Sequence, residues 1–179
     1  MTRPAALRLG VPARGMLAHR TLPQLLAPDR LVPGRRRDVD VLLAWGRRPR
    51  ALRVECPVRQ WDLPVWHLED GLLRSVAKGR EHPPLALLVD ELGVHFDATA
   101  PSRIEQLIAV PITAAEADRA RALQRLWCEQ RLSKVNPPVE AEAPQEPYVL
   151  VVDQSAGDRS IALGLADASS FRRMLQAAL

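Results

Sequence analysis

The residues best suited to chemistry lie where a mostly apolar segment, residues 63–68, runs into charged side chains. The residues that follow it include two carboxylates, a glycine, an arginine and a serine: Glu69, Asp70, Gly71, Arg74 and Ser75. Because unpaired charge is costly to bury, charged groups at the end of a buried strand usually serve a site and not a core. Ligands of open α/β sheets bind at the carboxyl ends of strands. This segment therefore predicts a small-molecule site.

The two carboxylates of this segment are neighbours in the sequence, so on a strand they would point to opposite faces. Glu69 and Asp70 are therefore not expected to form an acid/base pair with each other. In one interpretation, one of them faces a cleft, where it accepts a substrate proton or binds hydroxyl groups. In the other, they cap a turn and pair with Arg74. The residues alone leave both interpretations open.

A second acidic cluster follows a second apolar run. The run 148–152 leads into a carboxylate, polar side chains and a glycine: Asp153, Gln154, Ser155, Gly157 and Asp158. A carboxylate can attack a sugar anomeric carbon and form a glycosyl-enzyme intermediate, which makes Asp153 a candidate nucleophile. Gly157 would let the backbone approach a ligand closely. The alternative is that Ser155 or Asp158 caps the N-terminus of a helix, and the pattern by itself favours that cap.

Several classes of chemistry have no support in the sequence. There is no phosphate-binding P-loop and no glycine-rich dinucleotide motif after a strand, so neither a nucleotide kinase nor a dinucleotide enzyme is indicated. The four histidines are scattered and the two cysteines are far apart, so no metal site and no cofactor are predicted. Few cysteines and no secretory signal fit a reduced, cytoplasmic setting. No apolar run approaches the length of a membrane span, so any membrane association would be peripheral.

Charge is distributed unevenly along the chain. The formal net charge is +4, but residues 1–59 carry 13 arginines against 4 acidic residues, a net charge of +9, and the remainder is net −5. A basic first third suggests an anionic partner, such as a phosphate, an acidic sugar, a phospholipid head group or a nucleic acid. Aromatic residues make up only 4% of the chain, which disfavours nucleic acid because few stacking platforms are present.

Apolar runs and capping signals predict strands alternating with helices. Strands are expected over 38–46, 63–68, 85–90, 94–97 and 148–153, and helices over 17–26, 49–60, after Ser102, over 113–134 and over 169–179. Continuous apolar strands alternating with helices indicate a parallel, Rossmann-like sheet with helices on both faces, in the α/β class.

The proline-rich, acidic stretch 137–147 divides this organisation. Its composition favours an extended linker. The prediction is a Rossmann-like domain over 1–136, the linker over 137–147, and over 148–179 the first βα unit of a second domain. A lone βα unit cannot bury both faces of its strand, so it must pack onto the first domain or belong to something longer.

Six segments in order resemble the capsular polysaccharide synthesis family of KpsC-type β-Kdo glycosyltransferases. Each is weak alone, but their order and spacing together are specific. They are 44–49 (AWGRRP), 68–76 (LEDGLLRSV), 84–93 (PLALLVDELG), 97–105 (DATAPSRIE), 131–136 (RLSKVN) and 151–158 (VVDQSAGD).

The resemblance implies a GT-B-like architecture of two facing Rossmann-type domains, of which residues 1–136 would be the acceptor-side domain. It implies retaining transfer of Kdo, an acidic eight-carbon sugar, from CMP-Kdo to a lipid-linked saccharide, with no cofactor. Such an enzyme would work in the cytoplasm, peripherally at the inner face of the cytoplasmic membrane. The family module continues for about as long again. The chain is therefore expected to be incomplete, inactive alone, and completed by a C-terminal domain or chain.

The resemblance also implies roles for single residues. Asp153 would be the nucleophile, and Glu69 or Asp70 the base or a hydroxyl ligand. Arg74 and Arg47 would meet the Kdo carboxylate or a phosphate, since guanidinium binds such anions through paired hydrogen bonds. The remaining substrate-binding residues implied by the same motifs are Ser75, Gln154, Ser155, Gly157 and Asp158. At Leu72, Val135 and Ser155 the family commonly has a different residue type, which is a mild departure from its motifs. The alternative is a non-catalytic remnant or accessory module that binds an anionic saccharide or assembles with capsule machinery.

Overall fold

The computed structural model describes residues 6–34, 38–47, 62–77, 81–136, 142 and 144–179. Five strands form one sheet in the order β2-β1-β3-β4-β5. The first four strands run parallel to one another, and β5 runs antiparallel to β4. The strands are β1 (Arg8–Val11), β2 (Arg30–Pro33), β3 (Val41–Trp45), β4 (Val65–Asp70) and β5 (Leu87–Asp90).

The parallel strands place the predicted site at one edge of the sheet. The chain passes from β1 to β2 on one side and then crosses to β3 on the other side, so the strand order reverses between β1 and β3. The carboxyl ends of adjacent strands diverge at such a point, and ligands of open α/β sheets bind in the crevice outside it. Arg47, in the loop after β3, and Asp70, the last residue of β4, lie at this edge.

One face of the sheet is covered by two short helices, α1 (Arg14–Leu17) and α2 (Leu22–Leu25). Side chains from these helices pack with alternate residues of the strands in one buried cluster. That cluster contains Leu9, Val11, Met16, Leu22, Leu26, Val41, Leu43 and Leu68. A smaller cluster around Leu42 and Val39 lies on the opposite face. The helix predicted within 49–60 lies outside the described residues, so the covering of that face by a helix stays a prediction.

The direction of β5 corrects the expectation of an all-parallel sheet. A parallel return needs a crossover of a dozen or more residues, usually through a helix. The described part of the 71–86 connection contains no helix. The chain therefore turns back after this connection, and β5 pairs with β4 in the antiparallel direction. The amide of Gly71 donates to the carbonyl of Ala86 at 3.1 Å, and a Cβ at Gly71 would lie 2.6 Å from the Ala86 Cβ. Glycine at position 71 therefore allows the two chains to approach closely.

Two helices follow β5, and both begin with reciprocal capping. α4 (Arg103–Ile108) starts at Ser102, whose side chain bonds with Glu105, and α5 (Ala114–Glu129) starts at Thr113 and Glu116 in the same way. The helix predicted over 113–134 ends earlier, at Gln130. The strand predicted over 94–97 is wrong: these residues form a turn closed by a hydrogen bond from Asp97 N to Val94 O.

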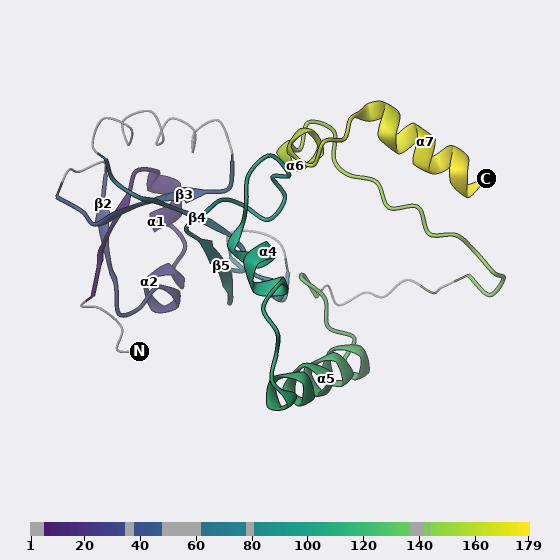
Figure 1. Ribbon diagram of the computed structural model, residues 1–179, viewed down its shortest axis with the longest axis horizontal. Helices are drawn as coiled ribbons and strands as arrows, with labels where there is room; N and C mark the ends of the chain where they lie inside the picture. Colours follow the sequence, from purple (N-terminus) through teal and green to yellow (C-terminus); the bar gives the residue numbers. More distant parts are fainter. Residues whose placement is uncertain (1–5, 35–37, 48–61, 78–80, 137–141, 143) are drawn as a thin grey trace.

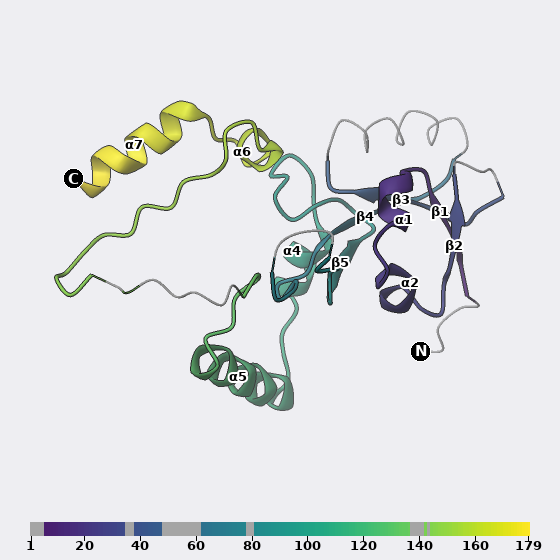
Figure 2. The ribbon, with the colours of Figure 1, turned by 180° about the vertical axis from the view of Figure 1, so that it is seen from behind.

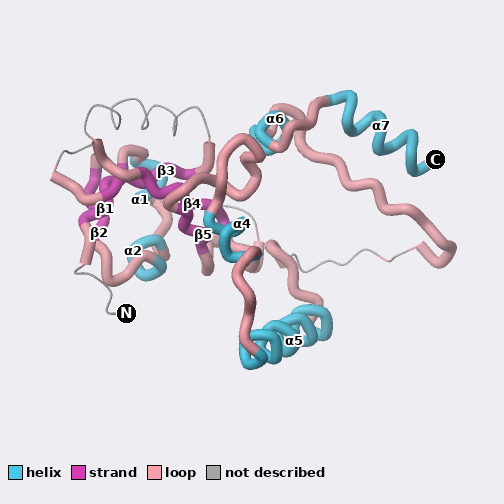
Figure 3. Tube along the Cα trace, viewed as in Figure 1, coloured by secondary structure: helices cyan, strands magenta, loops and turns pink. Residues whose placement is uncertain are grey.

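The C-terminal part lies apart from the sheet in both ribbon views (Figures 1 and 2). It contains α6 (Arg159–Leu163) and α7 (Ala168–Ala178), the latter close to the helix predicted over 169–179. The strand predicted over 148–153 is wrong: these residues form a loop (Figure 3) and most of them are exposed. A strand needs a neighbour for its backbone hydrogen bonds, and no described strand pairs with it. The proposed domain and linker boundaries stay predictions.

Candidate functional site

Asp70 forms an ion pair with Arg74 at the end of β4. The Arg74 Nε lies 3.0 Å from Asp70 Oδ2, and the two side chains are 14% and 27% exposed. Nη1 of Arg74 donates to Ser75 Oγ at 2.8 Å and to the carbonyl of His82 at 3.1 Å. The interpretation in which a carboxylate pairs with Arg74 is therefore confirmed for Asp70. The structure brings together three of the predicted site residues: Asp70, Arg74 and Ser75.

The segment after α5 holds this group in place. The amides of Arg74 and Ser75 both donate to the carbonyl of Lys134, at 2.8 and 3.3 Å, and Asn136 N donates to Val76 O at 2.8 Å. Ser75 and Val135 form a single parallel bridge. Two segments that are separated by the whole of α4 and α5 thus form one local structure at the carboxyl end of β4.

Glu69 points to the other face of the sheet, as expected for neighbouring strand residues. It lies opposite Leu88 in the β4–β5 register and lines a cavity on that face. Its carboxylate reaches over Gly46, which follows β3: a Cβ at Gly46 would lie 2.3 Å from Glu69 Oε1. Gly46 also has a φ of +57°, a conformation that glycine adopts without the cost that a side chain imposes. Glycine at 46 therefore makes room for the Glu69 carboxylate.

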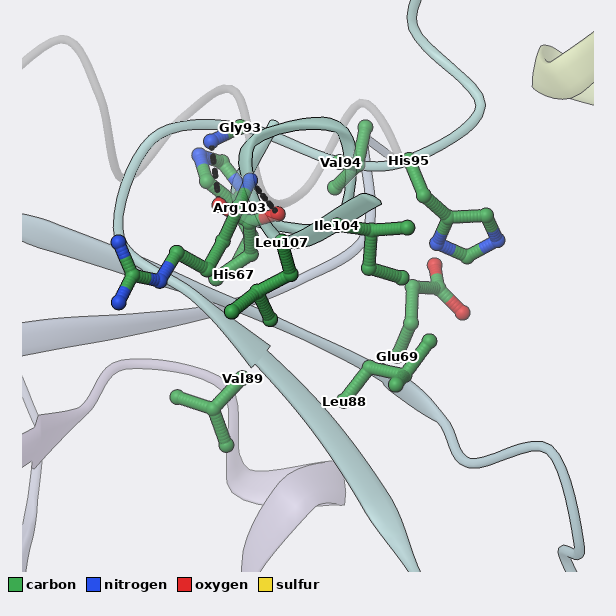
Figure 4. A pocket seen from close by; sticks show the side chains of 11 residues that line it. His67, Glu69, Leu88, Val89, Gly93, Val94, His95, Arg103, Ile104 and Leu107 are labelled. Atoms are coloured by element: carbon green, nitrogen blue, oxygen red, sulfur yellow. Dashed lines mark hydrogen bonds between the residues drawn. The ribbon is translucent and has the colours of Figure 1, made fainter. Parts of the chain in front are cut away.

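The cavity lined by Glu69 has a volume of about 100 Å³ and lies between β4, β5, the turn after β5 and α4 (Figure 4). Asp90 connects the turn after β5 with the start of α4 beside the cavity. Its Oδ1 accepts hydrogen bonds from the amides of Leu92 and Gly93, and its Oδ2 accepts one from the amide of Arg103. The polar lining includes His67 and His95, which the sequence analysis assigned to no site.

The surroundings of His95 favour its neutral imidazole over the charged form. Burial lowers the pKa of its imidazole, and the positive charge of Lys134 lowers it further, against an opposing effect of Asp90. Its ring meets Phe96 edge to face, with ring centroids 5.4 Å apart. A neutral imidazole offers one hydrogen-bond donor and one acceptor.

Arg47, predicted to meet an anion of the substrate, binds a carboxylate of this chain. Its Nε and Nη2 lie 3.1 and 3.0 Å from Asp97 Oδ2, and the Asp97 side chain is 2% exposed. Burial raises the pKa of this carboxyl, but hydrogen bonds from Thr99 and the Arg47 guanidinium outweigh burial, so the pKa lies below its ordinary value. The adjacent amide of Ala98 donates to Leu163 O at 2.9 Å, which attaches α6 to this turn.

The second acidic cluster lies elsewhere, on the exposed loop that leads to α6. Asp153 is exposed and its Oδ1 accepts a hydrogen bond from the amide of Gln154 at 2.6 Å. Asp158 is the N-cap of α6, accepting from the amide of Ser160 at 2.9 Å, so the capping alternative is confirmed for this residue. The remaining predicted residues of this cluster, Gln154, Ser155 and Gly157, are exposed on the same loop.

The structure does not seat the Asp153 loop against the group formed by Asp70, Arg74 and Ser75. The loop runs apart from the sheet in both ribbon views, and the cavity on β4 is lined by other residues. The described residues therefore do not bring the loop of Asp153 together with Asp70, and the role of Asp153 stays a prediction.

The sheet, its reversal of strand order and the acidic residues at its carboxyl edge define an α/β, Rossmann-like half-domain of a GT-B-like fold. A sequence model of the family described as "Capsule polysaccharide biosynthesis protein" matches residues 40–130, just over half of the chain. The chain belongs to this capsule polysaccharide biosynthesis family, as the six segments indicated.

Comparison with solved structures agrees. The chain is similar to a protein of Thermosulfurimonas dismutans described as "KpsC, beta Kdo 2,4 transferase", with a TM-score of 0.86 and 36% identity. The match covers 96% of this chain and 56% of that one. A second structure from the same organism, "KpsC, beta Kdo 2,7 transferase", matches with a TM-score of 0.56 and 21% identity over 87% of this chain and 51% of that one, which supports the fold alone.

Curated relatives point to the same family. The chain is 35% identical to the "Capsule polysaccharide modification protein LipA" of Neisseria meningitidis serogroup B, over 94% of this chain and 25% of LipA. It is 40% identical to the "Lipopolysaccharide-processing protein LpsZ" of Rhizobium meliloti, over 59% of this chain and 26% of LpsZ. The chain thus spans about a quarter of the length of these relatives.

Proposed function

We propose that this chain is the acceptor-side half of a retaining β-Kdo transferase of capsule biosynthesis, which moves Kdo from CMP-Kdo to a lipid-linked saccharide. The observation that carries the proposal is the match over 96% of the chain, at a TM-score of 0.86, to a structure described as a β-Kdo 2,4 transferase. No cofactor is needed for this reaction, since the nucleotide sugar is itself the substrate.

The proposal extends to the linkage that is formed. Identity to the 2,4 transferase is 36%, whereas the 2,7 transferase is 21% identical. We therefore expect the product to carry a 2→4 linkage, which linkage analysis of the product would test. A 2→7 product would refute this part while leaving Kdo transfer intact.

In the proposed reaction the carboxylate of Asp153 forms a bond to the anomeric carbon as CMP leaves. The acceptor hydroxyl then attacks the same carbon, releases Asp153, and gives its proton to Glu69 or Asp70. Two displacements at one centre retain its configuration. This scheme requires the loop 148–158 to move against the carboxyl edge of the sheet, which a complementing C-terminal domain or chain would accomplish.

The proposed setting is the cytoplasm, with peripheral attachment at the inner face of the membrane. Within the described residues, no helix is both long and apolar enough to span a bilayer. The lipid-linked acceptor would bring the enzyme to the membrane surface, and the net charge of +9 in residues 1–59 would favour anionic lipids.

The test is a two-part transfer assay. The chain is mixed with the C-terminal half of a KpsC-type module, CMP-Kdo and a Kdo-terminated lipid-linked acceptor, and product is followed by mass spectrometry. Asp153→Ala should abolish transfer, while Asp118→Ala, an exposed carboxylate on α5, should leave it unchanged. Unchanged transfer in Asp153→Ala would refute the nucleophile assignment.

A second candidate is a non-catalytic module that binds an anionic saccharide or assembles with capsule machinery. The exposed position of Asp153 favours it. Absence of transfer in every pairing, together with binding of an acidic saccharide by the chain, would support this candidate over the enzyme.

A further inference from the structure

A buried carboxylate holds the turn after β5 at the carboxyl end of β3. Because β5 runs antiparallel to β4, it ends level with the middle of that strand. The chain then returns to the end of β3, where Asp97 Oδ2 lies 3.1 and 3.0 Å from Nε and Nη2 of Arg47. The Phe96 ring lies there too, 4.0 Å from the Cβ position of Gly46. The turn is therefore attached to the edge at which ligands of open α/β sheets bind.

The Asp97 carboxylate meets hydrogen-bond donors at both of its oxygens. Oδ2 faces the Arg47 guanidinium, and Oδ1 accepts hydrogen bonds from the amide and the hydroxyl of Thr99, at 3.0 and 2.5 Å. The Asp97 side chain is 2% exposed, so this is a buried anion held from two directions. A buried ion pair is weak evidence for stability, and in some proteins it selects one conformation instead. The conformation that it would fix here is that of the turn 97–99.

This turn in its place holds α6. The amide of Ala98 donates to the carbonyl of Leu163 at 2.9 Å, and the ribbon views show α6 beside the turn (Figures 1 and 2). Among the described residues, no other backbone hydrogen bond joins the segment 144–179 to the residues before it. Leu163 is the last residue of α6 and is half-buried. The place of α6 therefore depends on the conformation of the turn.

The position of α6 in turn limits that of the loop before it. Gln154 Nε2 donates to Ser160 Oγ at 3.3 Å, and the amide of Asp158 donates to the carbonyl of Ser155 at 3.0 Å. Asp153 precedes the N-cap Asp158 by five residues, and an extended chain spans at most about 3.6 Å per residue, so Asp153 stays within roughly 18 Å of the start of α6. A fixed α6 therefore restricts where the Asp153 carboxylate can go.

We propose that Asp97 is a positioning residue: together with Arg47 it holds α6 at the carboxyl edge of the sheet, so that the loop carrying Asp153 can reach the sugar. This inference rests on the proposed function, in which Asp153 is the nucleophile. It assigns the Arg47 guanidinium to Asp97 instead of to an anion of the substrate. When the loop moves against the sheet, as the proposed reaction requires, α6 is the end that stays fixed.

Hydrogen exchange of the isolated full chain tests the attachment of α6 without any transfer reaction. In Asp97→Asn, the new side-chain NH₂ group must face donors from either Arg47 or Thr99, so the turn loses its conformation. Exchange at the amides of Ala98 and Gly164, followed by ¹⁵N NMR, should become about tenfold faster or more relative to the amides of the sheet, because charged hydrogen bonds are lost.

The matched control is Asn136→Ala, which removes hydrogen bonds to the backbone of Ser133, away from the turn. It should destabilise the chain by a comparable amount and leave exchange at Ala98 unchanged relative to the sheet. If Asp97→Asn fails to fold, Thr99→Val provides a milder variant, because it removes the hydroxyl donor to Asp97 and keeps the amide donor. Its exchange rate at Ala98 should lie above that of the control.

The two-part transfer assay tests the positioning role itself. A misplaced nucleophile slows the chemical step, so Asp97→Asn should lower kcat about tenfold or more and leave KM for CMP-Kdo within about twofold. Arg47→Ala should lower kcat by a similar factor. The double variant should lose no more than either single variant, because both act through one contact. If Arg47 instead binds an anion of the substrate, Arg47→Ala alone should raise KM, and the two effects should multiply.

Equal relative exchange at Ala98 in Asp97→Asn and Asn136→Ala would overturn the attachment of α6 by Asp97. Faster exchange at Ala98 with unchanged kcat would overturn the positioning role, and so would multiplying effects of the two substitutions at 47 and 97. Failure of the proposed function has a different signature. Absence of Kdo transfer in every pairing, with exchange at Ala98 still faster in Asp97→Asn, would overturn the proposed function and leave Asp97 as the residue that holds α6.

Discussion

Substitution of Gly46 by alanine tests whether the close approach of β3 to Glu69 is a real constraint. Gly46 has a φ of +57°, and a Cβ there would lie 2.3 Å from Glu69 Oε1. The new methyl group would therefore have two separate effects. It would strain the backbone, and it would displace the carboxylate that lines the cavity.

The two effects have different sizes. A residue with a Cβ in the left-handed region costs about 1–2 kcal/mol. Moving the Glu69 carboxylate out of its rotamer adds about 0.5–1.5 kcal/mol. Gly46→Ala should therefore lower the free energy of unfolding by about 1.5–3.5 kcal/mol in total.

A second glycine in the chain separates these contributions. Gly34 has a φ of +88°, but apart from its chain neighbours no described residue has an atom within 4 Å of its Cβ position. Gly34→Ala should therefore show the backbone cost alone, about 1–2 kcal/mol. A double-mutant cycle with Glu69→Ala isolates the contact, because removal of the carboxylate removes the clash. The coupling between positions 46 and 69 should be about 0.5–1.5 kcal/mol.

Urea denaturation followed by circular dichroism measures all of these free energies. For a chain of this size, each kcal/mol lost should also lower the melting temperature by roughly 2–4 °C. The reasoning would be refuted if Gly46→Ala cost no more than Gly34→Ala, or if the cycle showed no coupling between Gly46 and Glu69. Either result would mean that the Glu69 carboxylate does not occupy the space above Gly46.

Three further predictions concern the hydrogen bonds of single polar side chains. Asp97→Asn should cost about 2 kcal/mol at neutral pH, since it weakens charged hydrogen bonds from Arg47 and Thr99. Because the pKa of Asp97 is lowered in the folded chain, its carboxylate stabilises the fold fully above pH 3.8, its unperturbed pKa, and this stabilisation is lost as pH falls through the folded value. The difference in unfolding free energy between the wild-type chain and Asp97→Asn, measured with urea, should therefore shrink on acidification. Asn136→Ala removes hydrogen bonds to the backbone of Ser133 and should cost about 1–2 kcal/mol of unfolding free energy, measured by denaturation. Hydrogen exchange in the loop after β4 should become faster, and unchanged exchange would contradict the view that the segment around Asn136 holds this loop. Hydrogen bonds from the Ser169 hydroxyl and from the Ser170 amide and hydroxyl lower the pKa of Asp167 to about 2. NMR should therefore show the start of α7 intact at pH 3 and frayed only as pH falls through about 2, because the charged carboxylate caps the helix. Fraying that begins near pH 4 would contradict this prediction.

The elements that were predicted correctly are those whose signals are local. β3 and β4 are apolar runs, and the starts of α4 and α5 are marked by capping boxes that span four residues. The strands β1 and β2 were missed because each has only four residues among prolines and arginines. Their stability comes from pairing with each other and with β3, which no short window of sequence contains.

The candidate site shows the same division. The pairing of Asp70 with Arg74 joins residues four apart, so it could be considered from the sequence. The partner of Arg47 could not, because Asp97 lies fifty residues further along the chain. His95 was missed for a similar reason, since only the packing of the turn after β5 against β4 places it near Glu69.

The amino-acid sequence by itself determined the α/β class, the family, and the opposite orientation of Glu69 and Asp70, because alternation along a strand is a property of the backbone. The tertiary structure decided that β5 runs antiparallel, that Asp70 serves Arg74 while Glu69 lines a cavity, and that the 148–153 segment forms no strand. These outcomes depend on which distant groups meet, and a hydrogen bond or an ion pair forms only where the fold supplies its second partner.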